Sequence, residues 1–273
     1  MPRVRAALAD AERRLAAIPG SPGQDAALLM AHALGVSVAD LKLRYLDEVA
    51  PAAFEPLLQR RLGREPIAYI TGRAGFWTIE LTVGPGVLIP RADSEALIEA
   101  AVEHFGESGP KTIIDLGTGP GSLLLAALAQ WPEAHGLGID SSEKARDYFE
   151  TNVLDLDLED RARFKFDDWA VDTHGAFDLV LCNPPYIEDA ARLDPDVAEW
   201  EPHTALFAGA DGLDAYRVLA PQISRLVAPG GVACIEHGAG QGPAVAALFD
   251  GGPFTISSRK DLMGIDRCLV LRR

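Results

Sequence analysis

The sequence has few cysteines, no long apolar run and no continuous apolar segment at its amino terminus. The three cysteines, Cys182, Cys234 and Cys268, are widely spaced and each lies within an apolar stretch. We interpret them as small core residues, against a disulfide framework or a metal site. The apolar runs are shorter than a membrane span, and the amino terminus lacks the pattern of a secretory signal. We therefore expect a cytoplasmic protein with no membrane partner.

The sequence also lacks an excess of basic residues. It contains 25 Lys and Arg against 40 Asp and Glu, which gives a formal net charge of −15. Nucleic-acid phosphates are bound by clustered basic side chains under a positive field. The composition therefore argues against a stable nucleic-acid partner. The six histidines are scattered without the spacing of metal ligands, so we also predict no metal site.

The periodicity of the chain changes twice. Residues 1–72 carry apolar side chains at helical spacing, which predicts a small all-α N-terminal domain, with Asp25 as a helix cap. Residues 73–90 alternate between apolar and polar side chains and indicate a hairpin or linker. Residues 91–273 alternate strands with helices, the signature of an α/β fold with a doubly wound parallel sheet. The expected strands cover residues 112–115, 136–140, 164–167, 177–182, 232–236, 255–259 and 267–271, and a helix is expected over 91–104. The last two strands have no helix between them, so they must pair antiparallel or cross over differently.

A short apolar strand followed by two prolines is the most distinctive segment. Residues 179–182 predict a buried strand, and Pro184 and Pro185 end it because they cannot donate to a ladder. Asn183 and Tyr186 are then left at its carboxyl end, the edge where open parallel sheets bind ligands. A proline turn with an Asn cap is the purely structural alternative.

The segment that follows this turn has no clear period. Residues 187–213 are long for a connection and carry many acids. Long connections without regular structure are usually functional loops. We therefore expect a lid or a loop that faces the substrate.

A glycine-rich turn follows the first strand of the predicted sheet. Residues 113–122 indicate a strand, a turn and the start of an apolar helix, and Gly117, Gly119 and Gly121 let the backbone approach a ligand closely. A dinucleotide fingerprint needs a third glycine three positions after the second, where this sequence has Ser122. The spacing therefore argues against a dehydrogenase.

Acidic and aromatic side chains follow the next two strands. Asp140 comes about 20 residues after the loop, where a carboxylate can accept hydrogen bonds from two ribose hydroxyls. A helix cap is the alternative for Asp140, although Ser141 and Ser142 already offer capping groups. Asp168 can accept from an adenine amino group, and the indole of Trp169 can flank the ring. Such a pocket fits an adenosine without a pyrophosphate, which predicts S-adenosylmethionine as the cofactor.

Together these motifs resemble those of class I methyltransferases, and nearly the whole chain is similar to the HemK/PrmC family of protein glutamine methyltransferases. Besides the glycine loop and the Asn183-Pro184-Pro185-Tyr186 turn, the matching blocks are residues 65–72, 88–95, 201–202 and 261–267. Two residues depart from the family pattern, since Gly75 stands where an acid is common and Ala92 where a proline is usual. Both lie away from the cofactor loops, so they bear on linker geometry more than on activity.

The resemblance implies a Rossmann-like catalytic domain with a seven-stranded sheet, a helical domain for substrate recognition, and a release factor glutamine as methyl acceptor. The residues it implies for S-adenosylmethionine, which becomes S-adenosylhomocysteine, are Gly117, Thr118, Gly119, Pro120, Gly121, Asp140, Asp168, Trp169 and Asn183. Asn183 and the carbonyl of Pro184 would hold the acceptor amide beside Pro185 and Tyr186, with Asn183, Pro184 and Tyr186 as the catalytic residues. We expect the protein to act as a monomer.

Other functions stay open on the sequence alone. A related enzyme that methylates a ribosomal-protein glutamine is the closest rival, and residues 69–77 favour the release-factor branch. Adenine-N6 methyltransferases of nucleic acids share the Asn-Pro-Pro-Tyr turn, but the acidic net charge counts against them. A non-catalytic adenosine-binding module is disfavoured by the intact Asn183 and Tyr186.

Overall fold

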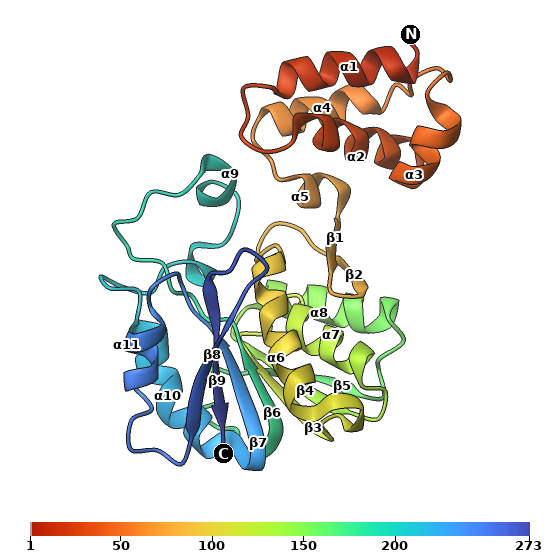
Figure 1. Ribbon diagram of the computed structural model, residues 1–273. Helices are drawn as coiled ribbons and strands as arrows, with labels where there is room; N and C mark the ends of the chain where they lie inside the picture. Colours follow the sequence, from red (N-terminus) through yellow and green to blue (C-terminus); the bar gives the residue numbers. More distant parts are fainter. Residues whose placement is uncertain (1) are drawn as a thin grey trace. The chain divides into compact units, whose positions relative to one another are not determined.

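The structure, a computed structural model, describes residues 2–273, and the chain divides into two compact units. The helical unit consists of the chain up to Arg73 together with Leu193–Trp200, and the α/β unit consists of Ala74–Arg192 and Glu201–Arg273. Figure 1 shows the elements of both units coloured along the sequence. No pattern in residues 187–213 indicated that Leu193–Trp200 would pack with the helices.

The helical unit confirms the all-α region expected at the amino-terminal end. Its elements are α1 (Val4–Leu15), α2 (Pro22–Leu34), α3 (Val38–Asp40) with the π-helical turn Leu41–Tyr45, α4 (Phe54–Leu62), α5 (Ile67–Thr71) and α9 (Pro195–Ala198). Apolar side chains at helical spacing close a core of their own, in which Leu29, Met30 and Leu41 are fully buried. Among residues 2–273 no single helix is long and apolar enough to cross a membrane. One pair of helical segments in this range, Pro22–Leu34 and Val38–Tyr45, has the required length and composition when taken together, but the two are bent by 101°.

Asp25 does not cap α2, contrary to the sequence-based expectation. The helix begins at Pro22, and Asp25 Oδ2 instead accepts a hydrogen bond from Arg61 Nε at 2.9 Å. Arg61 is 5% exposed and also donates to Asp196 Oδ2 at 2.7 Å. A guanidinium this far from water needs partners because an unpaired buried charge is strongly unfavourable. These contacts hold Leu193–Trp200 on the helical unit.

The predicted hairpin is present. β1 (Arg73–Phe76) and β2 (Ile79–Thr82) form a two-stranded sheet. The fully buried Asn152 of α8 (Glu143–Asp155) accepts from the backbone N–H of Thr82 at 2.6 Å and donates to its carbonyl at 3.0 Å. Asn152 Nδ2 also donates to the carbonyl of Pro120 at 2.9 Å. One amide side chain therefore ties β2 to the glycine loop.

The α/β unit contains a seven-stranded sheet in the order β5-β4-β3-β6-β7-β9-β8. The strands are β3 (Thr112–Leu116), β4 (His135–Asp140), β5 (Ala162–Phe166), β6 (Phe177–Cys182), β7 (Val227–Glu236), β8 (Thr255–Lys260) and β9 (Asp266–Arg272). The strands from β5 to β7 in this order are parallel, and β9 is antiparallel to both β7 and β8. This confirms the predicted Rossmann-like sheet and resolves its last two strands as an antiparallel pair.

Helices cover both faces of the sheet, as Figure 1 shows. α6 (Glu95–Phe105), α7 (Ser122–Gln130) and α8 lie on one face, and α10 (Asp214–Leu226) and α11 (Gly242–Ala247) lie on the other. Tyr216 of α10 and Val245 of α11 belong to the same buried core cluster as Val180 of the sheet. The three cysteines are free and buried, which confirms that they are core residues.

Several predicted elements have other bounds in the structure, α6 and β5 among them. The helix expected over 91–104 begins only at Glu95, because Arg91 is extended and Ala92–Ser94 forms a 3-10 turn. β5 ends at Phe166, one residue before the prediction, where its pairing with Asp140 of β4 ends. The later start of α6 lengthens the loop before it, and the earlier end of β5 lengthens the loop after it. Both loops lie at the edge of the sheet where the predicted site lies.

Candidate active site

Cross-strand pairing brings the ends of neighbouring strands into one row. Leu116, the last residue of β3, pairs with Ile139 on one side and with Cys182 on the other. Cys182 in turn pairs with Ile235. The residues that come next on these four strands are Gly117, Asp140, Asn183 and Glu236. The strand order changes direction between β3 and β6, which is where open α/β sheets bind ligands.

The glycine loop adopts a backbone that favours glycine. Gly117 has φ 74° and Gly119 has φ 56°, both in the left-handed region. A Cβ on Gly117 would also lie 3.1 Å from the indole of Trp169. The missing side chain therefore lets the aromatic ring lie directly against the loop.

The carboxylate of Asp140 is held by backbone donors. Its Oδ2 accepts from the N–H of Gly119 and its Oδ1 from the N–H of Ser142, both at 2.9 Å. Burial raises the pKa of Asp140, and these N–H groups oppose the rise. Ser142 is the residue that caps α8, because its side chain accepts from the N–H of Ala145. Asp140 is thus not the cap, and its carboxylate is held in place at the end of β4.

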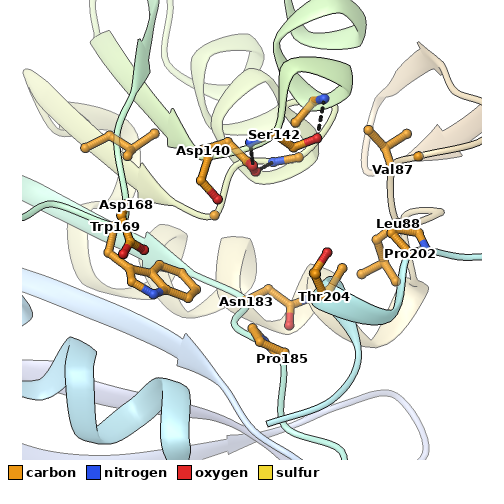
Figure 2. Close-up of a pocket in the computed structure, with 17 residues that line it drawn as sticks. Val87, Leu88, Asp140, Ser142, Asp168, Trp169, Asn183, Pro185, Pro202 and Thr204 are labelled. Atoms are coloured by element: carbon orange, nitrogen blue, oxygen red, sulfur yellow. Dashed lines mark hydrogen bonds between the residues drawn. The ribbon is translucent and has the colours of Figure 1, made fainter.

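A cavity of about 290 Å³ opens at this edge of the sheet. In Figure 2, Asp140, Asp168 and Trp169 lie on one side of it, and Asn183 and Pro185 lie across from them. The predicted site residues that line the cavity are Gly117, Gly119, Asp140, Asp168, Trp169, Asn183 and Pro185. The structure therefore brings together residues from the carboxyl ends of four strands, β3, β4, β5 and β6, that are far apart in the sequence.

The other predicted site residues lie outside this cavity. Thr118 and Pro120 line a smaller neighbouring cavity of about 50 Å³, which Asn183 also lines. Gly121, Pro184 and Tyr186 line neither of these two cavities. The ring of Pro184 is buried, so only its backbone is a candidate for contact with a substrate.

Further residues line the cavity to which sequence reasoning gave no individual role. They include Val87, Leu88 and Ser142, and from the loop 187–213, which was expected to face the substrate, Pro202, Thr204 and Ala205. Leu88 and Pro202 belong to two of the blocks that the sequence analysis noted as similar to the family. They are brought together by Glu201, which accepts hydrogen bonds from the guanidinium of Arg91 and from the N–H of Ile89 at 3.0 Å. The pattern of the two blocks was a usable signal, but it did not show that they pair.

The Asn-Pro-Pro-Tyr turn is anchored at both ends. Asn183 is half-buried and its Nδ2 donates to the hydroxyl of Ser94 at 3.1 Å. The hydroxyl of Tyr186 donates to Glu236 Oε1 at 3.2 Å. Burial and the neighbouring negative charge of Glu236 raise the pKa of Tyr186, which keeps the phenol protonated. The turn therefore presents the Asn183 side-chain oxygen as an acceptor that Ser94 does not occupy.

Asp115 is a further buried acid beside the loop. It is 1% exposed, and its Oδ2 accepts from the hydroxyl of Thr118 at 2.7 Å. Among residues 2–273 its Oδ1 has no hydrogen-bond partner. Burial raises the pKa of Asp115 to about 7, against the hydrogen bonds from Thr118 and the backbone of Leu124. The ionised form is therefore unfavourable in the folded protein.

We expect Asp115→Asn to raise the midpoint of thermal unfolding more at about pH 8 than at about pH 5. Between the unfolded pKa of 3.8 and the folded value of about 7, the unfolded chain releases its proton while the folded chain keeps it. Folding of the wild type is therefore disfavoured progressively as pH rises through this window, and the neutral amide removes that penalty. Calorimetry at both pH values measures the effect, with exposed Asp250→Asn as the control. An equal rise in the unfolding midpoint at both pH values would contradict a raised pKa of Asp115 in the folded protein.

The sheet and the site define the class of protein. The order of the seven strands, the glycine turn and the acid at the end of β4 are those of class I S-adenosylmethionine-dependent methyltransferases. The same fold occurs in the 16S rRNA N2 G1207 methyltransferase of T. thermophilus, solved with AdoMet and guanosine, at a TM-score of 0.53 and 19% identity over 74% of this chain and 49% of that chain. The family model described as Methyltransferase small domain matches residues 93–200.

Closer relatives identify the family. The family model for the PrmC N-terminal domain matches residues 6–72. The release factor glutamine methyltransferase of Rhodospirillum rubrum is 45% identical over 258 residues, which are 92% of this chain and 79% of that protein. The enzyme of the same name from Cereibacter sphaeroides is 40% identical over 99% of this chain and 98% of that protein. The chain belongs to the release factor glutamine methyltransferase family.

Proposed function

We propose that the protein transfers the methyl group of S-adenosylmethionine to the side-chain amide nitrogen of a glutamine in a peptide chain release factor. The observation that carries the proposal is the place of Asn183, which leaves the sheet beside the glycine loop and lines the cavity. Family membership supports it, because relatives matched over nearly their whole length carry this activity in their name. The ribosomal-protein and nucleic-acid alternatives have no comparable support.

The residues around the cavity fit the cofactor. S-Adenosylmethionine supplies a methyl group on a positively charged sulfur, from which a nucleophile can take it directly. Asp140 would accept hydrogen bonds from the two ribose hydroxyls, since its carboxylate lines the cavity at the end of β4. Trp169 would flank the adenine ring and Asp168 would accept from its amino group, because both line the cavity. The backbone of the glycine loop, Gly117 to Gly121 with Thr118 and Pro120, would lie along the rest of the molecule.

The acceptor amide needs help to react. Its nitrogen is a poor nucleophile because the lone pair is delocalised into the carbonyl. Asn183 Oδ1 and the carbonyl of Pro184 would accept its two hydrogens, fix the nitrogen in line with the methyl group and stabilise the positive charge that develops. Nδ2 of Asn183 is engaged by Ser94, which leaves Oδ1 for this role. The prolines restrict the backbone and so fix the carbonyl in advance.

Tyr186 completes the acceptor site as a wall beside the planar amide. Its hydroxyl is held by Glu236, so the ring cannot swing freely. No general base is required before transfer, because the methylated nitrogen is acidic and releases its proton afterwards.

We further propose that the helical unit recognises the release factor and that residues 187–213 exclude water from the site. This loop contributes Leu193–Trp200 to the helical unit and Pro202 and Thr204 to the cavity. We propose a cytoplasmic monomer without a stable nucleic-acid or membrane partner. The formal charge of −15 argues against a nucleic-acid partner, since the protein would repel the phosphates.

The function is tested by supplying S-adenosylmethionine with a labelled methyl group together with unmethylated release factor, ribosomal protein or nucleic acid. We expect label in the release factor and S-adenosylhomocysteine in equal amount. Label that enters only nucleic acid or only ribosomal protein would refute the proposal and support the corresponding alternative.

A further inference from the structure

A buried carboxyl group lies beside the acceptor turn, and no step of the proposed reaction uses it. Glu236 is the last residue of β7 and is 1% exposed. Because Ile235 pairs with Cys182, Glu236 lies at the end of β7 next to Asn183, which follows β6. Its Oε1 accepts from the hydroxyl of Tyr186 at 3.2 Å. A carboxyl group this far from water is unfavourable unless its contacts compensate, so its surroundings call for an explanation.

Ser94 connects this carboxyl group to Asn183. Ser94 is 3% exposed, and its hydroxyl accepts from Asn183 Nδ2 at 3.1 Å. The same hydroxyl lies beside Glu236, where its hydrogen bonding lowers the pKa of the carboxyl group. Among residues 2–273, Glu236 Oε2 has no hydrogen-bond partner, while Oε1 is the atom that the hydroxyl of Tyr186 contacts. Glu236 thus contacts Tyr186 directly and Asn183 through Ser94.

The charge of Glu236 sets the direction of the hydrogen bonds that run from Asn183 through Ser94 to Glu236. An ionised carboxylate only accepts, and a serine hydroxyl has one hydrogen to donate. When Ser94 donates to Glu236, only its lone pairs remain for Asn183. Asn183 must then turn its NH2 group toward Ser94, which leaves Oδ1 for the acceptor amide. With the direction reversed, the NH2 group of Asn183 would meet the N–H groups of the acceptor, and no hydrogen bond could form.

We propose that Ser94 and Glu236 are positioning residues for methyl transfer, which hold the Asn183 oxygen toward the acceptor amide and fix the ring of Tyr186. The inference rests on the proposed glutamine methylation. According to this inference, the buried carboxylate of Glu236 contributes to kcat and not to the affinity for S-adenosylmethionine.

The charge of Glu236 changes near neutral pH. Burial raises its pKa to about 7, while Ser94, Tyr186 and the charge of Arg267 oppose the rise. A protonated carboxyl group can donate to Ser94 and so permits the reversed direction. The ionised form is therefore the active one, and kcat is expected to fall as pH drops below about 7.

Other titratable groups surround Glu236. They are Asp93, Cys182, Tyr186, Tyr216, Arg267 and Cys268, with His237 next in the chain. Burial raises the pKa of the two thiols and the two phenols, so these stay neutral in this range. Asp93 and Arg267 form an ion pair at 3.0 Å. Replacing Glu236 itself tests whether the acidic limb of the kcat profile belongs to this carboxyl group.

The test measures methyl transfer to unmethylated release factor by Ser94→Ala and Glu236→Gln, with Ser224→Ala as the control. Ser224 donates to the carbonyl of Ala220 within α10, away from the site. We expect both site variants to lower kcat about 10-fold, with unchanged affinity for S-adenosylmethionine and an unchanged control. In the Asn183→Ala background, Ser94→Ala is expected to have no further effect, because the group it positions is gone. Glu236→Gln is expected to lose the acidic limb of the kcat profile.

Two results would overturn the positioning role. One is a Ser94→Ala loss that stays the same size in the Asn183→Ala background, and the other is an acidic limb that persists in Glu236→Gln. A wild-type enzyme that transfers no methyl group to glutamine would instead refute the proposed function. The wild-type assay therefore separates failure of the function from failure of this inference.

Discussion

Replacing Asn183 with alanine is expected to lower kcat for glutamine methylation about a thousand-fold. The variant loses the oxygen that would accept a hydrogen from the acceptor amide, and the loss is greatest in the transition state, where positive charge develops on the nitrogen. The fold is expected to persist, since Asn183 lies in a turn and its one side-chain hydrogen bond in the structure goes to Ser94. Single-turnover rates at saturating S-adenosylmethionine measure the effect.

The control for Asn183→Ala is binding of the cofactor. Asn183 lines the cavity, but its hydrogen-bonding group is assigned to the acceptor, so the affinity for S-adenosylmethionine should fall by only about threefold. Calorimetric titration gives that affinity directly. Turnover at the wild-type rate would remove the proposed role of Asn183, and a large loss of cofactor affinity would transfer it to the cofactor site.

Asp140→Ala is expected to show the opposite pattern, with the dissociation constant for S-adenosylmethionine raised about 100-fold. Hydrogen bonds to a charged oxygen are stronger than neutral ones, and the variant removes both oxygens proposed for the ribose. It also leaves the N–H groups of Gly119 and Ser142 without their acceptor, which loosens the loop. At saturating cofactor, kcat should remain close to that of the wild type.

Asp167→Ala is the matched control for Asp140. Both acids follow neighbouring strands of the sheet, but Asp167 pairs with Lys165 and does not line the cavity. We expect Asp167→Ala to bind S-adenosylmethionine as the wild type does. Equal losses in the two variants would mean that any acid at this edge matters, and the assignment of the ribose to Asp140 would be wrong.

The sequence was sufficient to predict the sheet and its working edge. Strand and helix periods alternate strongly over residues 91–273, and the ends of parallel strands necessarily meet at one edge. Gly117, Asp140 and Asn183 could therefore be placed near one another before any coordinates were known. Their side-by-side exit follows from a register that pairs Leu116 with both Ile139 and Cys182, which no local pattern encodes.

Partners distant in the chain could not be predicted from local patterns. Arg91 meets Glu201, and Arg61 meets Asp25 and Asp196, because folding brings each buried charge to a counter-charge. A lone carboxylate in a sequence does not say which of several arginines it will find. The same holds for Glu236, whose contact with Tyr186 depends on the pairing of β7 with β6.

The account is tested most directly by mapping the methyl group on a release factor after incubation with the enzyme and S-adenosylmethionine. Peptide mass spectrometry of wild-type and Asn183→Ala reactions is the measurement. We predict one added methyl group on the side-chain amide of a single glutamine with the wild type, and almost none with the variant. A methyl group on another residue, or equal modification by both proteins, would contradict the account.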